Sequence, residues 1–114
     1  MIEFVNTLCV RPLFLTEERT YTFDTDSFTF EPTSSDEDGG MLYNCDHVFV
    51  IDTPDKDTIT FFSQPRTSIV TLKDSHQRPY HVGTEDLPAR VYLQPHLNKT
   101  RLYMSCKMLS NPLI

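Results

Sequence analysis

The sequence contains no tryptophan and only 3 glycines, against 8 prolines, 8 phenylalanines and 5 tyrosines. A chain poor in Gly but rich in Pro, Thr and Phe is typical of β-strands joined by stiff turns. Motifs that carry common chemistry are also missing: there is no GxxxxGK[ST], GxGxxG, GxSxG or HExxH pattern. The sequence therefore excludes the usual phosphate-binding loops, the hydrolase nucleophile elbow and the zinc-protease helix.

Positive charge is scarce, since 10 Lys and Arg residues face 16 Asp and Glu residues and the net charge is −6. A surface of this charge repels phosphates, so we expect no direct binding of nucleic acid. The two halves of the chain nevertheless differ in sign. Residues 1–57 carry 13 acidic and 3 basic residues, whereas residues 58–114 carry 3 acidic and 7 basic ones. The halves could pair within one chain or between copies.

Cysteine is also rare, and Cys9, Cys45 and Cys106 form no CxxC pair. Because secreted disulfide frameworks normally have an even count, we interpret the three as free thiols in a reducing compartment. We find no cationic leader with a cleavage site, and no apolar run approaches the ~20 residues of a membrane span. We expect a protein without a signal peptide or membrane partner, either cytoplasmic or assembled into a particle.

The distribution of apolar residues predicts the fold. Polar and apolar residues alternate with period two in residues 20–24, 27–31 and 100–106, which is the pattern of half-buried strands. No segment has a helical repeat over three turns, and no linker or internal repeat divides the chain. We predict an all-β single domain over residues 1–114, an antiparallel β-sandwich or small barrel of about 7–9 short strands. An exposed acidic loop is expected at residues 31–40.

The most apolar stretch lies near the middle of the chain, in residues 45–62. Residues 48–51 are apolar on both faces of a strand, residues 52–58 form a polar turn, and residues 59–62 are apolar again. This pattern predicts a central hairpin covered on both sides. The side chains expected in its core are Val48, Phe49, Val50, Ile51 and Phe61.

A thiol, a carboxylate and an imidazole follow one another at Cys45, Asp46 and His47. These groups could support nucleophilic catalysis, but an activated Cys–His pair is normally built from distant segments. We therefore favour a packed thiol and a solvated histidine. The sequence predicts no catalytic residue and no enzyme activity.

Metal ligands are equally poorly indicated. The histidines lack the close spacing of a structural zinc site; they are His47, His76, His81 and His96. The acidic clusters could hold calcium but match no EF-hand loop, so we interpret them as solvated turn residues. These clusters are Asp24/Asp26, Asp36/Asp38 and Asp52/Asp55/Asp57. We predict no metal and no cofactor.

These observations favour a non-enzymatic structural or assembly protein, such as a small phage or viral particle component. It would act through contacts with other protein chains, by self-association or within a larger assembly. The alternative is a monomeric acidic β binding module for a peptide, glycan or host factor, or an inhibitor. In that case an aromatic set would form the binding surface unless it packs in the core. This set comprises Tyr21, Phe23, Phe28 and Phe30.

The polarised charge suggests which residues make the contacts. Acidic residues of the first half would pair with basic residues of the second half and set the register of the contact. The apolar C-terminal tip would dock on a neighbour. The residues expected to interact are Asp36, Glu37, Asp38, Asp52, Asp55, Asp57, Arg66, Arg101, Leu113 and Ile114.

Overall fold

The computed structural model describes residues 3–14, 18–25, 28–30, 32–37, 40–74, 76–109 and 112, with backbone alone for 3–6, 35–37 and 40–41. The described residues form strands and one short helix. In chain order these are β1 (Glu3–Pro12), β2 (Tyr21–Asp24), β3 (Phe28–Thr29), β4 (Thr33–Glu37), β5 (Gly40–Asn44), β6 (His47–Ile51), α1 (Lys56–Phe61), β7 (Arg66–Asp74), β8 (Pro79–Val82), β9 (Ala89–His96), β10 (Lys99–Ser105) and β11 (Lys107–Met108).

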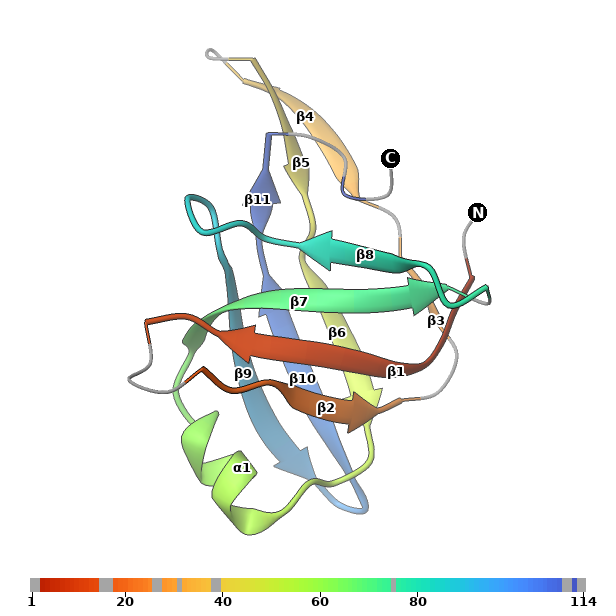
Figure 1. Cartoon of the computed structure of the whole chain (residues 1–114), viewed down its shortest axis with the longest axis vertical. Helices are drawn as coiled ribbons and strands as arrows, with labels where there is room; N and C mark the ends of the chain where they lie inside the picture. The colour runs from red at the N-terminus through yellow and green to blue at the C-terminus, as the bar shows by residue number, and fades with distance from the viewer. Residues whose placement is uncertain are drawn as a thin grey trace.

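Eight strands form one antiparallel sheet in the order β2-β1-β7-β9-β10-β6, with β3 beside β1 and β8 beside β7. The sheet bends, so that β8, β7, β1 and β2 make a front layer while β9, β10 and β6 cross behind it (Figure 1). Strand β7 belongs to both layers, because residues 66–68 pair with β9 and residues 68–74 pair with β1. The predicted antiparallel all-β fold is confirmed. The described part of the sheet does not close into a barrel, since its ends meet only at an isolated Thr25–Ile51 bridge.

The core lies between the two layers. Along β7, β9 and β10 alternate residues point inward, and Leu102 and Met104 are buried as the period-two pattern of residues 100–106 predicts. Each buried Leu or Val contributes about 1.5–3 kcal/mol relative to its exposed state. The helix α1 closes the lower end of the sheet, where the buried Phe62 accepts a hydrogen bond from the Leu93 amide at 2.9 Å.

The predicted central hairpin is wrong in two respects. Strand β6 pairs with β10 alone among the named strands, and its Phe49 and Ile51 are buried whereas Val48 and Val50 are 47% and 45% exposed. The expected return strand is instead the helix α1, and Phe61 at its end is only half-buried. An apolar run with one exposed face therefore follows the edge of the back layer.

A small sheet in the order β11-β5-β4 extends the back layer. Met104 lies opposite His47 in the main sheet, and Lys107 lies opposite Asn44 in the small one, so the register is the same on both sides of the junction. Strands β5 and β4 then continue as a hairpin that projects beyond the body (Figure 1). The irregular acidic loop expected at residues 31–40 is therefore largely a strand pair, in which residues 33–37 are hydrogen-bonded to residues 40–44.

Candidate protein-binding face

Several residues expected to contact other chains are used within this one. Asp52 forms an ion pair with Lys99 at 2.5 Å. The Arg66 guanidinium lies over the Phe61 ring at 4.2 Å and donates a hydrogen bond to the Phe61 carbonyl at 2.7 Å. Asp52 and Arg66 thus join segments of one molecule. Two further aspartates, Asp55 and Asp57, lie at the start of α1 and stay predictions.

The remaining expected contacts lie on the hairpin, on β10 or beyond the described residues. The backbone of Asp36 and Glu37 belongs to β4. Arg101 is exposed on β10. The positions outside the described residues are Asp38, Leu113 and Ile114.

The Cys45-Asp46-His47 trio takes part in packing and hydrogen bonding within the chain. Burial, and then the Asp46 charge, raises the pKa of Cys45 to about 11, and its thiol donates to the Tyr43 carbonyl at 3.7 Å. The Asp46 carboxylate accepts a hydrogen bond from the Cys106 amide at 3.0 Å.

The histidine of the trio is not solvated, contrary to our expectation. Its ring is half-buried and packs against three phenyl rings, with centroid distances of 5.9 Å to Phe28, 5.7 Å to Phe30 and 4.5 Å to Phe49. Burial lowers the pKa of His47, so the neutral form is favoured. The raised pKa of Cys45 disfavours the thiolate that nucleophilic catalysis requires.

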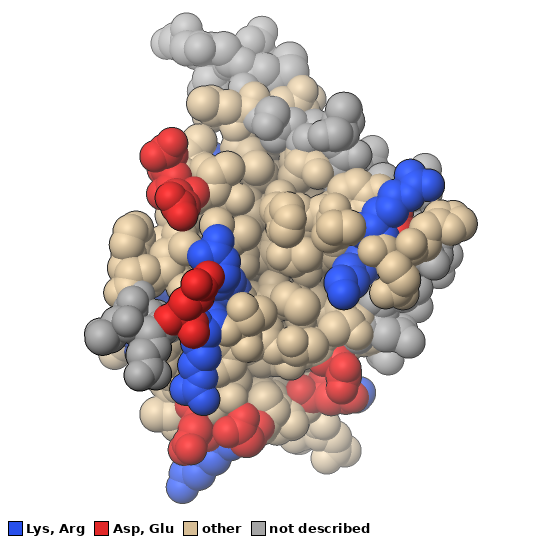
Figure 2. Space-filling view, viewed as in Figure 1, with Lys and Arg blue, Asp and Glu red and all other residues tan. Residues whose placement is uncertain are grey.

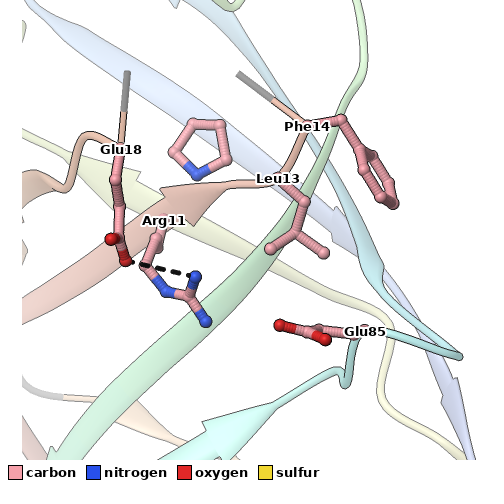
Figure 3. A pocket seen from close by; sticks show the side chains of 6 residues that line it. Arg11, Leu13, Phe14, Glu18 and Glu85 are labelled. Carbon is pink, nitrogen blue, oxygen red and sulfur yellow. Dashed lines mark hydrogen bonds and ion pairs between the residues drawn. The ribbon is translucent and has the colours of Figure 1, made fainter. Parts of the chain in front are cut away.

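A pocket of about 240 Å³ lies between the end of β1 and the segment that follows β8 (Figure 3). Arg11 and Glu18 turn toward each other there and form an ion pair at 3.4 Å, while Glu85 approaches from the other side. The described residues of the lining include no thiol, hydroxyl or imidazole group to pair as nucleophile and base. It comprises Arg11, Pro12, Leu13, Phe14, Glu18 and Glu85.

The outer face of the back layer is built differently. Because inward and outward residues alternate, burial of Leu102 and Met104 leaves Tyr103 facing out. Tyr103 lies opposite Val48 of β6 on one side and Tyr92 of β9 on the other. The two tyrosine rings are half-buried and stacked, with 4.7 Å between centroids and 6° between planes. An aromatic and aliphatic row thus crosses three strands.

Positive charge borders this row on both sides. In one direction Arg101 lies opposite Val50, and in the other Arg90 lies opposite Ser105. Both arginines are exposed, and neither forms a hydrogen bond or ion pair with another described residue. We call this surface the tyrosine face. It comprises Val48, Val50, Arg90, Tyr92, Arg101 and Tyr103.

The tyrosine face is hollowed at its Arg90 end. A pocket of about 360 Å³ opens there between the strands and the segment of residues 86–88. The segment loops away because strand pairing stops after β8 and resumes at β9. Gly83 makes the bend with φ +96°, and a Cβ on it would lie 2.8 Å from the Ala89 nitrogen. The hollow is thus a recess at the Arg90 end of this face.

The charge of the tyrosine face is opposite to that of the protein. Its six residues include two arginines and no carboxylate, while the chain has a net charge of −6. Carboxylates border the face: Asp46 accepts from the Cys106 amide, Asp52 is paired with Lys99, and Asp86 lines the hollow beside Arg90. On the opposite side of the molecule, uncharged side chains fill the centre and charged ones lie toward the margins (Figure 2).

The aromatic surface considered from the sequence is core instead. Phe23 and Phe30 are buried, and Tyr21 and Phe28 pack against the core while half-buried. Tyr103 lies outside the set predicted from the sequence, although the alternation carries a signal for it: buried Leu102 and Met104 require the residue between them to face out.

A scan of protein-family models and searches of curated proteins and solved structures find no match for this chain. Over the described ranges, no helix is long and apolar enough to cross a membrane. The same part of the chain brings together no group of three or more His, Cys, Asp or Glu residues able to hold a metal. The tyrosine face is therefore the feature of the described residues on which a functional proposal rests.

Proposed function

We propose that this protein is a non-enzymatic assembly component that binds another protein chain through the tyrosine face. The observation that carries the proposal is the stacked pair of Tyr92 and Tyr103, half-exposed between Arg90 and Arg101. Tyr and Arg are the residue types that dominate the energy of protein interfaces. Because the two rings already hold each other in place, a partner orders them at little entropic cost.

The charge of the face indicates the kind of partner. Two guanidinium groups without a carboxylate partner favour an acidic surface, and a second copy of this acidic chain supplies one. A basic face that meets an acidic surface is a contact between two different patches. Such contacts close into rings or extend into tubes and filaments. This geometry supports the expected role as a structural part of a particle of phage or viral type.

Sedimentation velocity over a range of protein concentrations at low salt tests the proposal. We expect the intact chain to self-associate and Arg101→Glu to weaken the association about tenfold or more, because a repulsive charge replaces an attractive one. The matched control is Lys73→Glu, which reverses a charge on β7 in the front layer, and it should behave as the intact chain does.

Two results would overturn the proposal. One is an intact chain that stays monomeric at high concentration and low salt, which would favour the alternative of a monomeric binding module. The other is binding of a single-stranded oligonucleotide in place of self-association, with the stacked tyrosines acting as a platform for bases.

A further inference from the structure

We infer that the acidic end of the β4–β5 hairpin of one copy binds the tyrosine face of the next copy, so that copies join head to tail. This inference rests on the proposed function and names the surface of the partner. It is carried by the position of the hairpin, by the charge of its end and by the geometry that keeps it away from its own tyrosine face.

The hairpin stands out from the body. Strands β4 and β5 extend past β8 and β11 at one end of the molecule (Figure 1). Among the described strands, β11 alone accompanies them, and it pairs with β5 at Tyr43 and Asn44, near the base of the hairpin. Beyond these two residues, the described part of the hairpin is held by pairing between its own two strands, through Asp36 opposite Met41 and Glu37 opposite Gly40.

The projecting end is strongly acidic. The sequence there reads Asp36-Glu37-Asp38, followed by Gly39-Gly40, with no basic residue in residues 31–44. The backbone places Asp36 and Glu37 in the last two positions of β4.

The hairpin cannot reach the tyrosine face of its own chain. Strand β5 pairs with β11 in the same register in which β6 pairs with β10. Strands β5 and β6 therefore continue in one direction, and Gly40 and Val48 lie far apart along it. Eight residues at about 3.3 Å each separate them by roughly 26 Å. The arm points away from the face, and the acceptor of its charge is another molecule.

The tyrosine face carries the positive charge that complements this acidic arm. Arg90 and Arg101 supply two guanidinium groups that pair with no described residue, one on each side of the tyrosine row. Exposed ion pairs contribute only about 0–1 kcal/mol each, so they set the register of the arm. Burial of Val48, Tyr92 and Tyr103 supplies most of the adhesion. Leu42 of β5, near the acidic end, provides an apolar side chain to cover part of them.

A mixing experiment tests the inference. One variant blocks the face, Arg101→Ser with Tyr103→Ser, and the other blocks the arm, Asp36→Asn with Glu37→Gln. Each alone should associate at least about tenfold more weakly than the intact chain. An equimolar mixture should form a one-to-one complex that grows no further, because the arm of the first variant meets the face of the second. Ser34→Ala, at the base of the hairpin, is the control and should associate normally.

The outcomes separate this inference from the proposed function. If the face variant loses association while the arm variant keeps it, the proposed function stands and the inference is overturned. The inference also fails if both variants are monomeric and their mixture contains no complex, since a head-to-tail contact would leave one working arm and one working face in the mixture. A monomeric intact chain overturns both. Circular dichroism verifies that each variant is folded, and Tyr92→Ser replaces Tyr103→Ser if it is not.

Discussion

Cys45 and Cys106 lie opposite each other where the main sheet passes into the small sheet, and the Cys45 amide donates to the Cys106 carbonyl at 2.9 Å. The Cys106 amide donates to the Asp46 carboxylate at 3.0 Å. The Asp46 carboxylate thus takes the place of the backbone carbonyl that usually accepts this hydrogen bond in a pair of strands. Since Lys107 and Asn44 pair just beyond this point, the junction holds the hairpin in line with the body.

Removal of this side-chain acceptor should loosen the junction. We expect Asp46→Ala to lower the free energy of unfolding by about 1–3 kcal/mol, because it leaves the part-buried Cys106 amide without an acceptor. Asp46→Asn keeps an acceptor oxygen and should retain most of the stability. Urea unfolding measures both, with Asp86→Ala as the control at an exposed position. A loss no larger than that of the control would mean that Asp46 does not hold the junction.

The two opposed thiols should be inert in the folded protein. Burial, and then the neighbouring Cys45 and Asp46, raises the pKa of Cys106 to about 12, so the thiolate is scarce at pH 8. A thiol-specific reagent should therefore label the half-buried Cys9 first and label Cys45 and Cys106 only after denaturation. In Cys9→Ser the rapid phase should disappear. Rapid labelling of Cys106 in the native protein would contradict the packing described here.

Stability should fall as the solution becomes acidic, because burial lowers the pKa of His47 below its ordinary value of 6.5. In this window the unfolded chain binds more protons than the folded one. The contribution of His47 is complete above pH 6.5 and declines as the pH falls toward the lowered pKa. Thermal unfolding between pH 7.5 and 5 should show a smaller decline in His47→Gln than in the intact chain. The exposed control His96→Gln should decline as the intact chain does, and equal declines in all three would refute the assignment.

Strand β6 provides a direct test of its one-sided burial. Phe49 is 2% exposed and packs edge-on against Phe28 at 4.9 Å, so Phe49→Ala should cost about 3–5 kcal/mol of unfolding free energy. Val50 is 45% exposed, and Val50→Ala should cost no more than about 0.5 kcal/mol. Chemical denaturation compares the two. Similar losses would mean that both faces of β6 are covered.

The sequence predicts the parts of this fold in which polar and apolar residues alternate. Leu102 and Met104 alternate with polar or amphipathic neighbours, and they point inward as the pattern requires. The run from Val48 to Ile51 is apolar on both faces, so it does not reveal that only one face is covered. The helix after it spans six residues, too few for a helical repeat to appear.

The candidate site is less readable from sequence. Strand β4 has the sequence TSSDE and contains no apolar residue, so its sequence does not predict a strand. It pairs with β5, which continues the strand pairing of β6 and β10 beyond the main sheet. Arg101 could be named from its charge alone. Its position beside Tyr103 and across from Val50 depends on strand order and register, which join segments far apart in the chain.

The most direct test of the account is the mass of Tyr103→Ser measured by sedimentation equilibrium from low to high salt, beside the intact chain. Salt screens the arginine contacts but not the burial of the stacked tyrosines. If the tyrosine face is the contact surface, the intact chain should associate at low salt and retain part of its association at high salt. Tyr103→Ser should be monomeric or at least about tenfold weaker at every salt concentration. A Tyr103→Ser protein that keeps the mass of the intact chain throughout would contradict the claim that the tyrosine face is the contact surface.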